Sequence, residues 1–216
     1  MQDLTPIIDQ IRNELDTRSE ARDQAIRRSR VLIRCCADSI RAMHRCEFDQ
    51  ARDLLETARQ AALEMVNDVL DHSSVYYAGY TQDALKEFVE AQVTYALLHN
   101  EPVPPPDALG VQVDYPAYLK GLAEAASEIR RAILDTVRKG DLERGEMLLS
   151  NMEEIYAAMI TIDFPDAVTT GLRRTTDALR AVLERTRGDL TVSMQQEKLR
   201  LALRHVEEHI NNVTQG

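Results

Sequence analysis

Residues 5–45, TPIIDQIRNELDTRSEARDQAIRRSRVLIRCCADSIRAMHR, contain the pattern that decides the fold. Apolar side chains recur at intervals of three and four from Ile7 and Ile11 to Met43, which is the spacing of one face of an α-helix. The stretch begins with Thr-Pro, a typical helix start, and neither Gly nor Pro follows Pro6 within it. The pattern therefore predicts one very long helix.

The rest of the chain repeats this spacing between short punctuating segments. A proline-rich connection follows residue 100, Gly140 marks a helix end, and Gly188-Asp189 either ends or bends the last long helix. Further helices are predicted over residues 48–71, 77–99, 116–139, 141–162, 165–187 and 190–210. No segment alternates with period two, so we expect an all-α bundle of six to seven long helices. We assign residues 1–216 to a single domain, in which residues 190–210 are either integral or an appended element.

The composition is that of an ordinary globular protein. Hydrophobic residues make up 44% and charged residues 29% of the 216 residues. There is no long apolar run to span a membrane and no N-terminal stretch that resembles a signal peptide. Cys35, Cys36 and Cys46 are odd in number and lack the spacing of a zinc site, so we expect buried helix cysteines in a cytoplasmic protein.

The net charge of −10 argues at first against a nucleic-acid partner, because phosphate binding depends on Lys and Arg. The charge is, however, unevenly distributed. Residues 18–52 carry nine Arg against five acids, and residues 173–204 carry eight bases against four acids. Residues 53–129 carry thirteen acids against three bases. Two basic outer segments therefore flank an acidic middle.

Arginines form stripes on both basic segments, at intervals that place them on one helix face. A stripe of this kind can follow a phosphate backbone, because Arg binds phosphate bidentately. A solvated face paired with acids of neighbouring helices, or the Arg bias of a GC-rich genome, explains the pattern equally well. The candidate nucleic-acid-binding residues are Arg27, Arg30, Arg34, Arg41, Arg45, Arg173, Arg174 and Arg180.

Carboxylates form a second stripe, in which Asp83, Glu87, Glu90 and Thr94 share one face of the predicted helix 77–99. Two carboxylates one turn apart can hold Mg²⁺ from one side, and a third would come from another helix. The start of the predicted helix 141–162 offers three candidates. These are Asp141, Glu143 and Glu146. The alternative is a solvated acidic face.

Other chemistries lack their residues. A di-iron bundle needs Glu-x-x-His pairs, and no Glu in the chain has His three positions later. His205 and His209 are one turn apart, but an exposed polar face accounts for them. There is no glycine-rich phosphate loop, no nucleophile elbow and no paired cysteine motif, which excludes nucleotide hydrolases and acyl-transfer enzymes of those types.

Four motifs in this order resemble the translin and translin-associated factor X (TRAX) family, over most of the chain. The first is Leu85-Lys-Glu-Phe-Val-Glu-Ala91, which is similar to the TRAX pattern Glu, aromatic, Val, Glu, Ala. The second is Leu109-Gly110 followed by Asp114-Tyr-Pro-Ala-Tyr-Leu-Lys-Gly121 and Ser127-Glu-Ile-Arg130. The third is the Gly140-Asp141 turn. The fourth, residues 164–188, resembles the C-terminal helix of single-chain prokaryotic members.

The resemblance implies an all-α subunit of a hollow, roughly octameric homo-oligomer that binds RNA or single-stranded DNA inside. It further implies Mg²⁺-dependent endoribonuclease activity, with Mn²⁺ as an alternative ion, because Glu87 and Glu90 match the TRAX pair that plain translin lacks. Glu143 stands where TRAX has a second Asp, and Glu146 lies beside Met147, where TRAX has a further Glu. We therefore expect Glu87, Glu90 and Glu143 to be catalytic, with Asp141 and Glu146 as other candidate ligands.

Two rival functions remain open on the sequence. A non-catalytic oligomer of the translin type would bind single-stranded RNA or DNA with a steep salt dependence and never cleave it. A purely structural helical oligomer would show no salt-dependent binding. The RNA substrate and any second subunit type are not encoded in a recognisable way.

Overall fold

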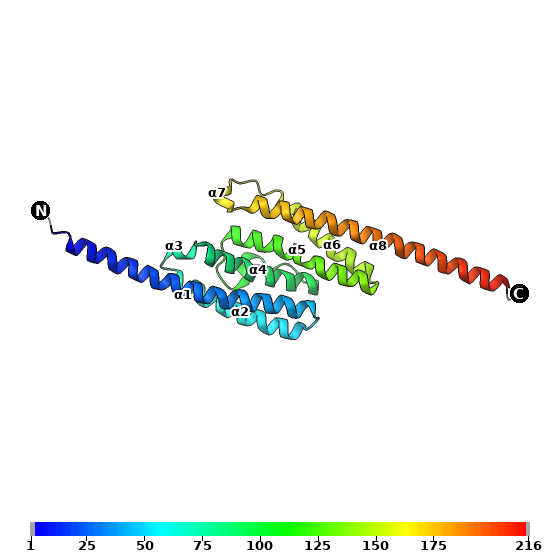
Figure 1. Cartoon of the computed structure of the whole chain (residues 1–216), viewed down its shortest axis with the longest axis horizontal. Helices are drawn as coiled ribbons and strands as arrows, with labels where there is room; N and C mark the ends of the chain where they lie inside the picture. The colour runs from blue at the N-terminus through cyan, green and yellow to red at the C-terminus, as the bar shows by residue number, and fades with distance from the viewer. Residues whose placement is uncertain (1–2, 215–216) are drawn as a thin grey trace.

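Helices make up almost all of the computed structural model, which describes residues 3–214 (Figure 1). In chain order they are α1 (Thr5–His44), α2 (Phe48–Val69), α3 (Ser73–Tyr76), α4 (Gly79–His99), the 3₁₀ turn η1 (Pro106–Leu109), α5 (Tyr115–Lys139), α6 (Leu142–Met159), α7 (Asp166–Thr169) and α8 (Leu172–Thr214). No strand occurs within residues 3–214. The predicted all-α bundle of long helices is therefore confirmed.

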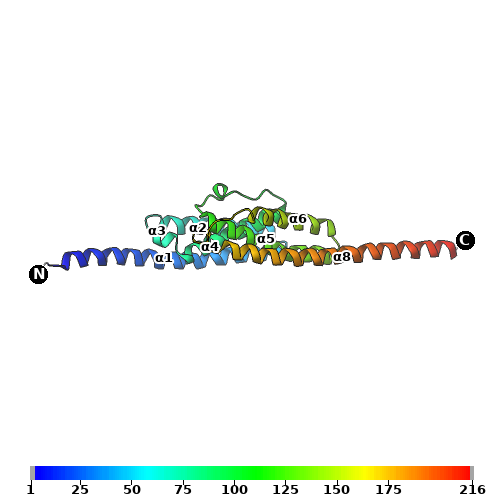
Figure 2. The same ribbon diagram turned by 90° about the horizontal axis from the view of Figure 1, so that it is seen from above.

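The long helices form a central bundle in which neighbours pack in a simple order. The α1 helix packs on α2 and α4, α4 packs on α5, and α5 packs on α6 and α8. Residues 100–114 return along the bundle, so that α4 and α5 run in the same direction (Figures 1 and 2). Tyr118 fixes this connection by donating a hydrogen bond from its hydroxyl to the carbonyl of Pro104 at 2.8 Å.

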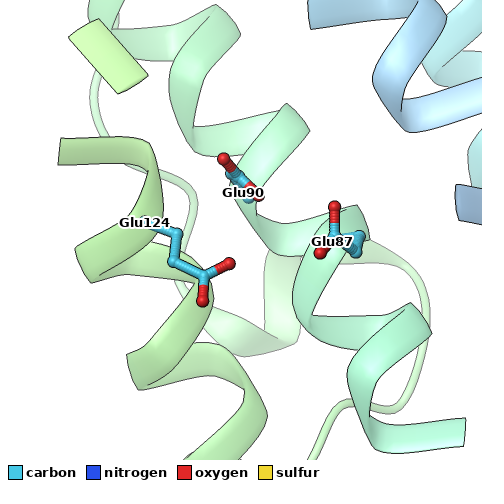
Figure 3. Close-up of side chains that lie close together, drawn as sticks. All are labelled: Glu87, Glu90 and Glu124. Carbon is cyan, nitrogen blue, oxygen red and sulfur yellow. The ribbon is translucent and has the colours of Figure 1, made fainter. Parts of the chain in front are cut away.

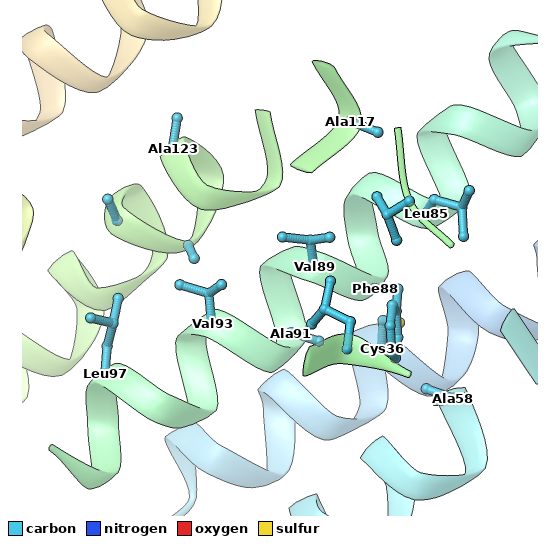
Figure 4. Close-up of a cluster of buried hydrophobic side chains, with 14 of the residues drawn as sticks. Cys36, Ala58, Leu85, Phe88, Val89, Ala91, Val93, Leu97, Ala117 and Ala123 are labelled. Atoms are coloured by element: carbon cyan, nitrogen blue, oxygen red, sulfur yellow. The ribbon is translucent and has the colours of Figure 1, made fainter. Parts of the chain in front are cut away.

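One apolar core runs through the bundle, and α4 lies at its centre (Figure 4). Phe88, Leu85 and Val89 of α4 are fully buried, as are Leu32 and Cys36 of α1. Burial of side chains of this size is the main force that holds helices together. The core therefore fixes which face of α4 points inward and which face is left for polar side chains.

The helix ends follow local backbone chemistry. Asn100 after α4 and Gly140 after α5 both adopt left-handed conformations, with φ of 57° and 81°. Such residues end a helix by turning the chain so that the next backbone N–H groups bond the last carbonyls, as Asn100 and Glu101 donate to Leu97 and Ala96. The segment predicted as one helix from residue 165 differs, because Thr170 and Gly171 have positive φ and separate the short α7 from α8.

The α8 helix continues through Gly188, where the sequence predicted an end or a bend. A glycine inside a helix costs only about 1 kcal/mol, which neighbouring contacts can offset. Arg130 of α5 supplies such contacts by donating to Thr186 Oγ1 at 2.9 Å and to Asp189 Oδ2 at 2.7 Å. Residues 190–210 are therefore a continuation of α8.

Two helical ends project from opposite sides of the bundle (Figure 1). We call residues 5–20 of α1 the N-terminal projection and residues 191–212 of α8 the C-terminal projection. Both carry exposed large apolar side chains. They are Ile7, Ile8, Ile11 and Leu15 on α1, after Leu4 at its start, and Val192, Leu199, Leu201, Leu203, Val206 and Ile210 on α8.

The cysteines lie in three different environments. Cys36 is buried in the core, Cys35 is half-buried, and all three thiols are free. Cys46 is exposed in the turn after α1, where its φ is 62°, so the prediction of a buried helix position is wrong for this residue. Across residues 3–214, no helix combines the length and apolar character that crossing a bilayer requires.

Candidate metal centre and nucleic-acid surface

Three glutamates meet where α4 packs on α5 (Figure 3). Glu87 and Glu90 come from α4 and Glu124 comes from α5, and each offers one carboxylate oxygen within 4.8 Å of those of the other two. All three side chains are half-buried. We call these residues the carboxylate triad; within residues 3–214 it is the only group of three or more potential metal-ligating side chains this close together.

The triad forms because α4 and α5 approach closely at one glycine. A Cβ atom at Gly121 would lie 2.6 Å from the carbonyl oxygen of Lys86 and 2.7 Å from Cβ of Val89. Only a residue without a side chain allows this approach. Val89 is buried at this contact and Phe88 is buried on the side of α4 toward Cys36 of α1 (Figure 4), while Glu87 and Glu90 lie close to Glu124.

Two cationic or ionisable side chains contact the acids at this junction. Lys86 Nζ donates to Glu87 Oε1 at 2.8 Å and also contacts Glu124. His44 of α1 has a side chain only 2% exposed, and its Nε2 lies 2.5 Å from Glu128 Oε1. The junction therefore combines four carboxylates with one lysine and one buried histidine.

The concentration of negative charge changes the ionisation of the junction. Burial and the neighbouring charges of Glu87 and Glu124 raise the pKa of Glu90 to about 8. Burial alone would lower the pKa of Lys86, but the carboxylates of Glu124 and Glu87 together raise it above its ordinary value. Burial, followed by the charge of Glu87, raises the pKa of the Cys36 thiol. The Glu90 shift therefore reflects burial first and the surrounding carboxylates second, only partly offset by Lys86.

The donor set fits a hard divalent cation. Mg²⁺ and Mn²⁺ prefer carboxylate oxygens, and the triad offers three from two helices. An added cation would relieve the mutual repulsion that raises the pKa of Glu90. Thr94, one turn beyond Glu90, is fully buried, unlike the half-buried triad, and its Oγ1 has no hydrogen-bond partner among the described residues. The residues present therefore fit the ion that the sequence implies.

The structure places Glu87 and Glu90 together but does not add the third carboxylate expected from α6. Asp141 caps α6 by accepting a hydrogen bond from the backbone N–H of Arg144 at 3.1 Å. Glu143 and Glu146 are exposed on the first turns of α6. None of the three belongs to the triad, because α6 packs mainly on α5 and α8, whereas α5 itself covers the relevant face of α4.

Glu124 is the residue that sequence reasoning missed. It lies three residues after Gly121 and four before Glu128, between the last two segments of the second resemblance motif. One sequence signal pointed to Glu124. Gly121 can mark a close contact between helices, and the carboxylates Glu124 and Glu128 follow it one and two helical turns later. Spacing along one helix could not show which other helix faced it.

All eight arginines proposed from sequence are exposed. Arg41, Arg45 and Arg180 pair with acids of their own helix or the adjoining turn, namely Asp38, Glu47 and Glu184. Arg27 donates to Gln24 at 2.8 Å. The remaining four form no ion pair within residues 3–214. They are Arg30, Arg34, Arg173 and Arg174. The arginines on α1 stand on the face away from the core residues Leu32 and Cys36.

Comparison with known proteins gives matches over most of the chain, although no family model matches it. The uncharacterised protein MJ0175 of Methanocaldococcus jannaschii is 29% identical over 196 residues, which cover 90% of this chain and 86% of that protein. The crystal structure of AfC3PO, also solved as a complex with duplex RNA, superposes with a TM-score of 0.81 and 28% identity, covering 88% of this chain and 97% of that one.

A second solved structure, apo-NeC3PO, has the same fold, with a TM-score of 0.79 and 21% identity over 89% of this chain and 100% of that one. These assemblies are of the translin/TRAX type. The fold and the order of sequence motifs therefore agree with the same family.

Proposed function

Because the chain is a translin/TRAX-like protein, we propose that it is the subunit of a homo-oligomer that binds RNA and cleaves it with a divalent cation held by the carboxylate triad. The observation that carries the proposal is the meeting of Glu87, Glu90 and Glu124 at the α4–α5 contact. The likeness to AfC3PO, whose structure includes duplex RNA, supports RNA as the ligand.

In this proposal the triad residues bind and orient the ion, and the surrounding residues hold them in place. Gly121 sets the distance between the helices, and His44 holds the side chain of Glu128 beside the triad. A bound Mg²⁺ or Mn²⁺ ion supplies Lewis-acid stabilisation of the charge that develops during phosphodiester hydrolysis. The exposed arginines bind the phosphate backbone without reading bases.

Cleavage of end-labelled RNA tests the catalytic part of the proposal. We expect wild-type protein to cut in Mg²⁺ or Mn²⁺ and to stop in EDTA. Glu124→Gln, which keeps the shape and removes the charge, should reduce the rate by at least about 100-fold, as loss of an essential charge-stabilising group does. Glu143→Gln should cut at the wild-type rate. If Glu143→Gln slows cleavage and Glu124→Gln does not, the third carboxylate ligand comes from α6 instead of α5. Cleavage that is insensitive to EDTA would exclude the metal mechanism.

RNA binding without cleavage is the rival outcome, and it is measured separately in EDTA. Single-stranded RNA, duplex RNA and single-stranded DNA should be compared, with the salt dependence of each affinity. The plot of log affinity against log salt has a negative slope. Removing two phosphate contacts with Arg30→Gln and Arg34→Gln should make this slope shallower by about 2. Arg52→Gln is the matched control, because Arg52 is exposed but pairs with Asp49 on α2.

The projecting ends support the oligomeric part of the proposal. Ile8, Ile11 and Leu15 continue the seven-residue phase of the buried residues Leu32 and Cys36 on the same helix. Val192, Leu199 and Val206 repeat at intervals of seven on the other projection. Apolar residues with this repeat are typical of helices that pack on another helix, and exposed ones favour association between copies.

Sedimentation measures this association directly, including the octamer that the family resemblance implies. Ile8→Asp combined with Ile11→Asp should shift the protein to smaller species while leaving its helical circular dichroism unchanged. Asn13→Asp, on the polar side of the same turns, should assemble as the wild type does. A wild-type monomer at micromolar concentration would exclude the oligomer.

A further inference from the structure

The carboxylate triad already contacts a cation, and that cation belongs to the chain. Lys86 Nζ lies 2.8 Å from Glu87 Oε1 and also contacts Glu124, so it bridges the two helices that build the triad. Its side chain is 15% exposed, against 30% for Glu87 and 35% for Glu124. The ammonium is therefore the most deeply placed charge among these three partners.

The ammonium and a divalent ion need the same oxygens. A divalent ion held by the triad would take ligands from Glu87 and Glu124 at roughly 2.0–2.2 Å. The ammonium of Lys86 already contacts one oxygen of Glu87 and one of Glu124, so a divalent ion that binds the same carboxylates is repelled by a positive charge at short distance. The lysine stem is long and flexible enough to withdraw, unlike the triad carboxylates on their two packed helices.

We propose that Lys86 is an internal counter-ion that occupies the cation position of the carboxylate triad and must withdraw before Mg²⁺ or Mn²⁺ binds. This inference rests on the metal site of the proposed function. Ion binding is then an exchange, in which the two charge-assisted hydrogen bonds of Lys86 are lost as the metal–carboxylate contacts form. The exchange raises the concentration of free ion that the site requires, and Lys86 offsets part of the negative charge of Glu87 and Glu124 when no ion is bound.

Titration with Mn²⁺ alone, in the absence of RNA, tests the exchange. Lys86→Met removes the ammonium and keeps most of the apolar stem, so its Mn²⁺ affinity should be on the order of tenfold higher than that of the wild type. Lys120→Met is the matched control on α5, because Lys120 donates to the carbonyl of Thr170 at 2.8 Å and forms no ion pair with a triad residue within residues 3–214. Its affinity should equal that of the wild type.

Amine labelling of the wild-type protein gives a second measurement that does not depend on a variant folding. Acetylation by an activated ester, read by mass spectrometry, should increase several-fold at Lys86 when Mn²⁺ is added, because the released ammonium loses its two carboxylate partners. Labelling at Lys120 should not change. Unchanged or reduced labelling of Lys86 in a protein that binds Mn²⁺ would overturn the exchange.

The two proposals fail in distinguishable ways. If Lys86→Met binds Mn²⁺ no more tightly than the wild type, while Glu124→Gln abolishes binding, the metal site stands and the counter-ion role of Lys86 is wrong. If neither the wild type nor Lys86→Met binds Mn²⁺ at millimolar concentration, the metal site itself is wrong. Tighter binding by Lys86→Met that Glu124→Gln abolishes supports both.

Discussion

The two halves of α1 have the same apolar spacing, but only one of them is covered by the rest of the chain. Leu32 and Cys36 in the inner half are fully buried against the bundle, whereas Ile7 and Ile11 in the outer half are 48% and 49% exposed. The outer half projects beyond the bundle (Figure 1). An apolar stripe thus indicates that a helix needs a partner, and the fold decides whether that partner is the same chain or another.

The α4–α5 contact differs from the outer half of α1, because charged side chains are partly buried there instead of apolar side chains being exposed. Glu87, Glu90 and Glu124 are half-buried there because α4 and α5 approach closely where Gly121 meets Lys86 and Val89. The bundle uses its packing to hold carboxylates close together, and the projections leave apolar residues in water. Chemistry is therefore expected in the bundle, and association at the projections.

Truncation of a large side chain should separate the two regions most clearly. Phe88→Ala removes a fully buried aromatic side chain from α4 and should lower the free energy of unfolding by about 3–5 kcal/mol. Leu199→Ala removes a 61% exposed side chain from the C-terminal projection and should change it by less than about 0.5 kcal/mol at concentrations where the protein is dissociated. Urea denaturation measures both, and equal losses would contradict the division into covered and uncovered regions.

A methyl group at the α4–α5 contact should have the next largest effect. Gly121→Ala places a Cβ atom 2.6 Å from the backbone oxygen of Lys86, so the helices must move apart. Overpacking of this kind costs about 1–3 kcal/mol of unfolding free energy. Because the triad spans the two helices, Mn²⁺ affinity should fall in parallel. A destabilised protein with unchanged Mn²⁺ affinity would show that the helix separation does not control the triad.

Sequence spacing was sufficient for most of the helices and for two of the three triad residues. Glu87 and Glu90 are one turn apart on one helix, so their common face follows from the period alone. Glu124 depends on α5 rather than α6 lying against that face, which is set by Gly121 and by the long return of residues 100–114. Such long-range choices depend on how side chains fit together, which periodicity does not encode.

Tertiary contacts also decide the course of α8 at Gly188, which the sequence pattern alone did not predict. Gly188 is a helix breaker by propensity, and the sequence predicted an end or a bend there. Local propensity was outweighed by contacts from α5, where Arg130 binds Thr186 and Asp189 on either side of the glycine. Tertiary contacts of this kind can be seen only once the neighbouring helix is placed.

Replacement of one triad charge should change how stability depends on pH, unlike a replacement on a projection. The pKa of Glu90 is about 8 in the folded protein, against an ordinary value of 4.5, so between these values the folded protein binds more protons than the unfolded chain. Stability therefore falls as pH rises through this window. In EDTA, Glu90→Gln should remove this fall and stabilise the protein at pH 8 by on the order of 2 kcal/mol.

The matched control for Glu90→Gln is Glu14→Gln on the N-terminal projection, where the side chain is 67% exposed. This variant should keep the wild-type decline in stability between pH 5 and 8. Thermal melts across that range, at one protein concentration, compare the three proteins. A decline that persists in Glu90→Gln would show that another group causes it.

The smallest expected effect comes from a glycine inside α8 that has no close neighbour. A Cβ atom at Gly188 would meet nothing within 4 Å, in contrast to Gly121, and Gly188 lies within the continuous helix α8 near the start of the C-terminal projection. Gly188→Ala should therefore stabilise the protein by about 0.5–1 kcal/mol, because alanine loses less backbone entropy than glycine on forming a helix. The same substitution would thus have opposite signs at two glycines of one chain, and urea denaturation of the two variants measures this directly. Destabilisation by Gly188→Ala would mean that α8 must bend or be contacted at this point, as it would be if another subunit packed closely against the glycine.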